Sequence, residues 1–92
     1  MRNLLAFDLG ASNGRAILGQ FDGEKITMRE LHRFENNYIE MNGVFYWDLP
    51  YLYNQLKQGF LAFKNANVGE LDCFGIDTWG VDYGLLDKND QL

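Results

Sequence analysis

The chain has 92 residues, which is enough for one small domain. Hydrophobic residues make up 47% of it and aromatic residues 15%, so a disordered chain is excluded. The 13 acidic residues outnumber the 8 basic ones and give a net charge of −5, which argues against a nucleic-acid partner and favours a small-molecule ligand.

Several features predict a cytoplasmic protein. The chain has one cysteine, Cys73, so no internal disulfide can form, as is usual in a reducing compartment. The apolar stretch from Leu4 to Leu9 is too short for a signal peptide and is interrupted by Asp8. No segment approaches the roughly 20 apolar residues that cross a membrane. Cys73 itself lies in an apolar run, where we expect a buried, inert thiol.

The first element is a hairpin. Two apolar runs, residues 4–9 and 15–18, flank a turn of small and polar residues at 10–14. Side chains of Ser12 and Asn13 can donate hydrogen bonds, and glycines let backbone N–H groups approach an anion closely. The turn is therefore a candidate phosphate site, with Asp8 placed to face a hydrated metal ion on that phosphate. An ordinary hairpin turn is the alternative, since neither a P-loop nor a dinucleotide fingerprint is present.

A third strand is expected after the turn signal Asp22-Gly23. Residues 25–34 alternate apolar and polar side chains without keeping a strict period of two, which predicts a bulge near Arg29-Glu30. His32 lies in this strand among charged neighbours. We interpret His32 as a surface or cross-strand residue rather than a ligand or an acid.

A short hairpin or an ordered loop, and then a helix, are expected next. Residues 38–46, with Asn42-Gly43 at the centre, indicate the hairpin or loop. Asp48 is a good N-cap and Pro50 suits a first helical turn, so a helix is predicted over Leu49 to Asn65. Its apolar face, which we expect to pack on the sheet, consists of Leu49, Leu52, Tyr53, Leu56, Phe60 and Phe63.

The last part of the chain predicts two more strands. Residues 73–76 are apolar enough for a central strand, and residues 83–86 indicate another strand. A helical crossover normally returns a strand parallel to an earlier one. If the strand at 73–76 lies beside the first strand, Asp8 and Asp77 reach the same carboxyl edge, where ligands bind in open α/β sheets. The expected fold is thus a mixed α/β sheet.

Chemistry at that edge points to a phosphate, a metal ion and a sugar. Two or three carboxylates, Asp8, Asp77 and Asp82, suit a hydrated Mg²⁺ ion carried in with a nucleotide. Phosphoryl transfer needs mainly positioning and charge neutralisation. Trp79 beside Gly80 offers an aromatic face next to open backbone, a common way to hold a sugar. The alternative for residues 77–82 is a polar loop with one packed tryptophan.

Four segments resemble the amino-terminal part of the FGGY carbohydrate kinases. They are residues 7–15 (FDLGASNGR), 31–34 (LHRF), 47–48 (WD) and 75–82 (GIDTWGVD), and the last is far more specific than the first. The similarity runs from about Asn3 to the end of the chain. It implies an incomplete ribonuclease-H-like, or actin-like ATPase, fold and transfer of the terminal phosphoryl group of MgATP to the 1-hydroxyl of L-rhamnulose, in L-rhamnose breakdown.

The resemblance also implies roles for individual residues. The nucleotide phosphates would be held by Ala11, Ser12, Asn13, Gly14 and Arg15, where Asn13 replaces a common serine. Gly80 would contact the sugar, and Asp77, Thr78 and Trp79 would shape its pocket. Asp8 would face Mg²⁺ through water.

No catalytic base is assigned to this chain. Family members are several times longer, and the resemblance implies that the base lies beyond Leu92, so residues 1–92 would form part of the first kinase domain without an internal boundary. We expect this chain to be inactive alone and to self-associate through its open sheet edge and its uncovered sheet face. The alternatives are a non-catalytic binding module, a kinase for another ketose, and a ribonuclease-H-like nuclease with two metal ions.

Overall fold

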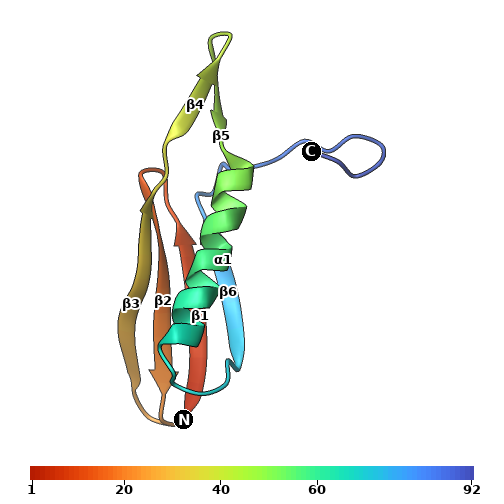
Figure 1. Ribbon diagram of the computed structural model, residues 1–92. Coiled ribbons are helices and arrows are strands. Elements are labelled where there is room, and N and C mark those ends of the chain that lie inside the picture. The colour runs from red at the N-terminus through yellow and green to blue at the C-terminus, as the bar shows by residue number, and fades with distance from the viewer.

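The computed structural model describes residues 1–92 as a mixed α/β structure (Figure 1). Its elements are β1 (Arg2–Leu9), β2 (Asn13–Phe21), β3 (Ile26–Glu35), β4 (Tyr38–Met41), β5 (Val44–Trp47), α1 (Leu49–Asn65) and β6 (Cys73–Thr78). The main sheet has the order β3-β2-β1-β6, in which β1 is antiparallel to β2 and parallel to β6. The β4–β5 hairpin forms a separate two-stranded sheet that projects beyond the main one (Figure 1). No helix is long and apolar enough to cross a membrane.

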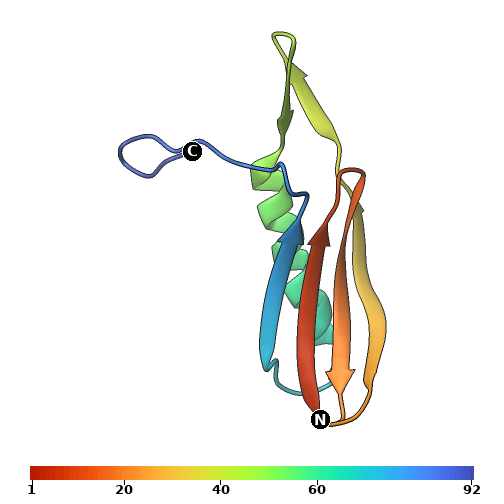
Figure 2. The same cartoon turned by 180° about the vertical axis from the view of Figure 1, so that it is seen from behind.

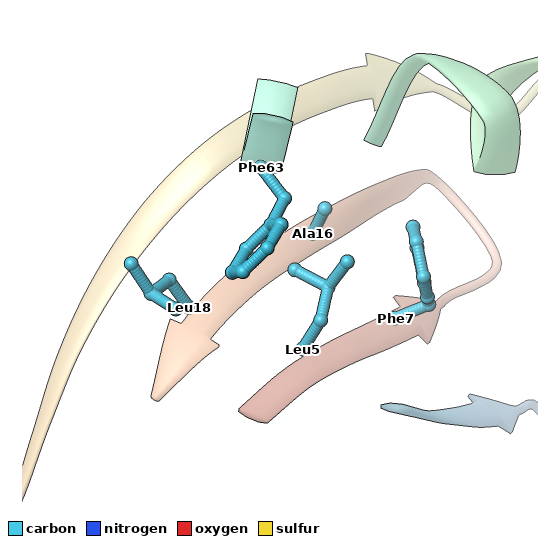
Figure 3. Packing of buried hydrophobic residues seen from close by; sticks show 5 residues of the cluster. All are labelled: Leu5, Phe7, Ala16, Leu18 and Phe63. Carbon is cyan, nitrogen blue, oxygen red and sulfur yellow. The ribbon is translucent and has the colours of Figure 1, made fainter. Parts of the chain in front are cut away.

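The hydrophobic core lies between α1 and one face of the main sheet. Alternate residues of β1 are buried because successive side chains of a strand point to opposite faces. The principal cluster, shown in Figure 3, contains Leu5, Phe7, Ala16, Leu18 and Phe63. The opposite face of the sheet carries no helix (Figure 2). The three antiparallel strands and the crossover helix that the sequence predicts are confirmed.

The predicted bulge in β3 is confirmed close to its expected place. Ala16 pairs with His32, but Ile17 pairs with Glu30, so Leu31 is the extra residue on β3. One inserted residue moves the following side chains to the other face of a strand. This explains why the apolar residues of β3 do not keep a period of two.

Helix α1 has the predicted bounds, and its ends show why. The Asp48 side chain accepts a hydrogen bond from the Tyr51 N–H at 3.1 Å, which satisfies one of the free donors of the first turn. Pro50 lies in that turn, where its missing N–H costs little. The helix stops at Ala66, and Asn67 then adopts a left-handed φ of 53°.

The buried face of α1 differs in part from the predicted one. Leu49 and Tyr53 are exposed, whereas Leu52 between them is buried in the cluster with Leu9 and Phe34. Gly59 is buried instead. A Cβ at Gly59 would lie 2.3 Å from Cε1 of Phe7, so the missing side chain leaves room for this ring.

Two predictions about the end of the chain are wrong. The apolar run at 73–76 predicts a buried central strand, but β6 is the edge strand of the sheet and all its residues are exposed, Cys73 included. Residues 83–86 form no strand. A strand needs a partner for its backbone hydrogen bonds, and no other strand pairs with the free edge of β6.

Candidate functional site

The turn between β1 and β2 is tight and its tip is free. The Gly10 N–H donates to the Asn13 carbonyl at 2.9 Å. Ala11, Ser12 and Asn13 are exposed, and the hydroxyl of Ser12 and the amide side chain of Asn13 make no hydrogen bond within the chain. The tip therefore presents polar groups that are available to an anion.

Asn36 supports this turn and was missed by the sequence analysis. Its side chain is 5% exposed, its Nδ2 donates to the Gly10 carbonyl at 2.7 Å, and its backbone N–H donates to the Ser12 carbonyl at 3.0 Å. These bonds tie the tip to the end of β3. In the sequence, Asn36 is one of two asparagines after a strand, a pattern typical of an ordinary loop.

Gly14 has a packing reason for lacking a side chain. It is buried, and a Cβ there would lie 2.1 Å from Cζ of Phe34. The Phe34 ring thus lies directly over the start of β2. The glycine is required by the core whether or not its backbone also contacts a phosphate.

Asp8 and Asp77 meet at one edge of the sheet, as the crossover predicts. Asp8 lies opposite Arg15 on β2 and opposite Asp77 on β6. The Arg15 Nη2 donates to Asp8 Oδ2 at 2.7 Å, with both side chains partly exposed. The carboxylate that was expected to face a metal ion is therefore already paired with a guanidinium.

Two adjacent carboxylates, those of Asp8 and Asp77, fit a hydrated Mg²⁺ ion, which keeps several waters and needs few protein ligands. A set of three carboxylates is not assembled, since no group of three or more His, Cys, Asp or Glu side chains is placed to hold a metal. Asp82, the expected third member, instead accepts a hydrogen bond from the Trp47 indole.

The segment after β6 turns sharply at Trp79–Asp82. The Asp82 N–H donates to the Trp79 carbonyl at 2.9 Å, and the Trp47 Nε1 donates to Asp82 Oδ1 at 2.8 Å. Gly80 lies in this turn, and a Cβ there would meet no atom within 4 Å. The backbone around Gly80 is therefore open to a ligand.

An apolar hollow of about 1280 Å³ adjoins this turn. It is bounded by the β4–β5 hairpin, the first turns of α1 and the segment that follows β6. Leu9 and Thr78, the last residues of β1 and β6, lie at its wall together with Trp79 and Asp82. The carboxyl edge of the sheet thus opens into a space large enough for a small molecule.

His32 has a structural place outside this hollow. Its Nε2 is 2.7 Å from Oε1 of Gln55 on α1, and its ring stacks on Phe34 with the centroids 5.7 Å apart. It is half-buried, and these contacts link β3 to the helix. The sequence predicted a surface or cross-strand residue, whereas the polar partner of His32 lies on the helix and its ring stacks on Phe34 of the same strand.

Several curated proteins match this chain over nearly its whole length. The rhamnulokinase of Mannheimia succiniciproducens is 46% identical over 92 residues, which is 98% of this chain and 19% of the relative. Those of Halalkalibacterium halodurans and Bacteroides thetaiotaomicron are 46% and 42% identical, each over 99% of this chain and 19% of its own length. This chain is homologous to the amino-terminal part of rhamnulokinases. No protein-family model matches it.

The homology to rhamnulokinases agrees with the architecture described above. Three antiparallel strands, a crossover helix and a parallel fourth strand are consistent with the actin-like ATPase domain at the amino terminus of these enzymes. The chain spans about a fifth of the length of the curated rhamnulokinases that it matches. The similarity is to the rhamnulokinases, and it does not by itself show the activity of these 92 residues.

Proposed function

We propose that this chain forms part of the active site of a kinase that transfers the terminal phosphoryl group of MgATP to the 1-hydroxyl of L-rhamnulose, in the cytoplasm. The observation that carries the proposal is the parallel pairing of β1 with β6. This pairing brings the turn after β1 and the turn after β6 to one edge of the sheet. Leu9, at the end of β1, and Trp79, after β6, line the apolar hollow there. Phosphate and sugar sites are thereby adjacent, as phosphoryl transfer requires.

The nucleotide would be held by the β1–β2 turn. This turn supplies the N–H groups of Ala11 and Ser12, which bond to no other backbone group, and the free polar side chains of Ser12 and Asn13. Gly14 and Arg15 belong to β2, whose backbone pairs with β1 and β3, so Arg15 would contribute its positive charge. Asn36 keeps the turn rigid, because it binds the carbonyls of Gly10 and Ser12 and leaves the N–H side free. A rigid array of donors stabilises phosphate charge without reorganisation.

A magnesium ion would be held at the same edge. Asp8, with Asp77 beside it, would hold the ion through water. When bound, the ion neutralises charge on the transferred phosphoryl group. Arg15 already bonds to Asp8, so the guanidinium fixes the position of this carboxylate before any ligand arrives.

The sugar would lie against the turn after β6. Gly80 would contact it through the backbone, while Asp77, Thr78 and Trp79 would shape the pocket. The open space at Gly80 and the aromatic ring of Trp79 at the wall of the hollow support this assignment. The catalytic base would be supplied from outside these residues, so the isolated chain should bind ligands without turnover.

NMR titration tests this proposal directly. MgATP should shift the amide signals of residues 11–15, and L-rhamnulose should shift those of residues 78–82. Asp8→Asn should weaken the MgATP response and leave the sugar response intact. D-Xylulose is the matched control for a kinase of another ketose, and an equal response to it would refute the substrate assignment. Asp8-dependent release of ADP with L-rhamnulose would show that a base lies within the chain.

We also propose that the isolated chain associates with a second copy of itself. Its accessible surface is 7100 Å², against about 5,500 Å² expected for a compact monomer of its mass. The excess of about 1,600 Å² is twice what each partner buries in an interface of ordinary size. Apolar side chains of the hairpin and of residues 79–92 are exposed, Phe45 by 63% and Leu85 by 77%.

Sedimentation velocity over a broad concentration range tests the self-association. The wild-type chain should sediment as a dimer or larger species, and Phe45→Asp with Leu85→Asp should shift it toward monomer. Leu61→Asp is the matched control, since Leu61 is 48% exposed but belongs to α1 and not to the hairpin, to an edge strand or to residues 79–92. A wild-type chain that stays monomeric throughout would overturn this proposal without affecting the ligand proposal.

A further inference from the structure

We propose that Trp47 is the positioning residue of the sugar subsite. Its indole N–H holds the carboxylate of Asp82, and through it the turn that carries Gly80, in a fixed place at the wall of the hollow. The inference rests on the proposed sugar-binding role of this turn. Trp47 itself touches neither phosphate nor metal in this scheme and acts through Asp82.

The bond is the main polar link between the end of the chain and the rest of the molecule. Within residues 79–92, the other hydrogen bonds are local ones, such as that from the Asp82 N–H to the Trp79 carbonyl. The Trp47–Asp82 bond, 2.8 Å long, is the only one that joins these residues to an element before β6. Without it, no hydrogen bond would join residues 79–92 to an element before β6.

Trp47 is well suited to act as an anchor. It is the last residue of β5 and directly precedes the helix N-cap Asp48, so its backbone is fixed on both sides. Its side chain is half-buried and packs against the cluster of Leu9, Phe34 and Leu52. An indole has one donor and no acceptor, and Asp82 Oδ1 satisfies this donor.

The geometry links the anchor to Gly80. The Asp82 backbone N–H closes the turn on the Trp79 carbonyl, while the Asp82 side chain is held by Trp47. Both ends of the turn are therefore fixed, and Gly80 lies between them. A backbone contact to a ligand loses strength when its position is loose, so fixing this turn in advance favours binding.

Four variants distinguish loss of the Trp47–Asp82 hydrogen bond from other effects of substitution at this place. Trp47→Phe removes the donor but keeps an aromatic ring in the cluster. Asp82→Leu removes the acceptor at an exposed site, whereas Asp82→Asn retains an acceptor oxygen and should rescue the bond. Tyr46→Phe is the matched control, since it alters a neighbouring aromatic residue of β5 whose hydroxyl makes no hydrogen bond in the structure.

The first readout needs no ligand. In ¹H–¹⁵N NMR, the heteronuclear NOE of the Gly80 and Asp82 amides should fall in Trp47→Phe and in Asp82→Leu. A lower NOE reports increased motion on the ps–ns timescale. It should stay at the wild-type value in Asp82→Asn and Tyr46→Phe. Unchanged NOE values in both Trp47→Phe and Asp82→Leu would overturn the inference.

The second readout is the affinity for L-rhamnulose, followed at the same amides. Loss of one solvent-exposed hydrogen bond predicts roughly threefold to tenfold weaker binding for Trp47→Phe and Asp82→Leu. Asp82→Asn should keep the wild-type affinity. Equal affinity in all variants would refute the positioning role. If the wild-type chain binds no sugar, the proposed substrate site fails, and the NOE values alone decide whether Trp47 holds the turn.

Discussion

Replacing Gly59 by alanine has two opposite effects on the free energy of unfolding: alanine favours the helix, but its Cβ overfills the core. At an exposed position inside a helix, Gly→Ala stabilises a protein by about 1 kcal/mol. At Gly59 the new Cβ would lie 2.3 Å from Cε1 of Phe7 and 3.1 Å from the Cβ of Ala16. Phe7 and Ala16 are both buried, and the Phe7 ring packs on Phe60 with the centroids 5.0 Å apart. The ring therefore has little room to move.

Overpacking of this kind costs about 1–3 kcal/mol. After the gain in helix propensity is subtracted, we expect Gly59→Ala to lower the free energy of unfolding by about 1 kcal/mol. For a domain of this size, the melting temperature should fall by about 4–8 °C. Helix propensity alone predicts that Gly59→Ala raises the free energy of unfolding.

Urea denaturation followed by circular dichroism measures this change, at a protein concentration low enough to limit self-association. The control is the same substitution in a Phe7→Leu background, where a smaller side chain leaves space for the Cβ. There Gly59→Ala should be neutral or stabilising. If Gly59→Ala stabilises the otherwise wild-type chain by about 1 kcal/mol, the Phe7 ring is not confined and the packing argument is wrong.

Three further substitutions test other parts of the fold. Gly14→Ala should lower the free energy of unfolding by about 1–3 kcal/mol in chemical denaturation, because its Cβ would meet the Phe34 ring, and Phe34→Leu should relieve this effect. Asp48→Ala should cost about 1 kcal/mol in the same assay through loss of the cap on the Tyr51 N–H, whereas Asp48→Asn should cost less. The N–H groups of the Asp22 turn hold the pKa of its carboxyl below the ordinary value, so its stabilisation is complete above that value and is lost as the pH falls through the folded-state pKa. Asp22→Asn should therefore unfold at a lower temperature than wild type at neutral pH and at nearly the same temperature in strong acid.

Local signals in the sequence predicted the regular elements well. Asp48 and Pro50 mark the start of α1, and the structure begins the helix at Leu49. The irregular period of β3 indicated a bulge, which lies at Leu31. These features depend on neighbours in the chain, through capping, proline geometry and side-chain alternation.

The parallel neighbour of β1 was also predicted, because a crossover helix restricts where the next strand can pair. That inference predicts Asp8 beside Asp77, and the structure pairs the two residues. It did not reveal Asn36, whose hydrogen bonds reach Gly10 and Ser12 across the turn. Contacts between residues so far apart leave no periodic trace in the sequence.

Burial was the main point at which prediction from the sequence failed. The apolar residues around Cys73 predict a buried strand, and those at 83–86 predict another strand. Apolar side chains favour burial, but they do not ensure that another element covers them. Whether a partner is present depends on the rest of the sheet, and β6 has none on its outer side.

The sequence by itself determined the helix, the three antiparallel strands and the polar turn after β1, because each follows from interactions between near neighbours. It also carried the motifs that match rhamnulokinases. Only the tertiary structure decided which carboxylates are engaged: Asp8 with Arg15, and Asp82 with Trp47. The physical reason is that a hydrogen bond requires two groups to meet in space, and here the folded sheet, hairpin and helix bring residues 35 positions apart within 2.8 Å.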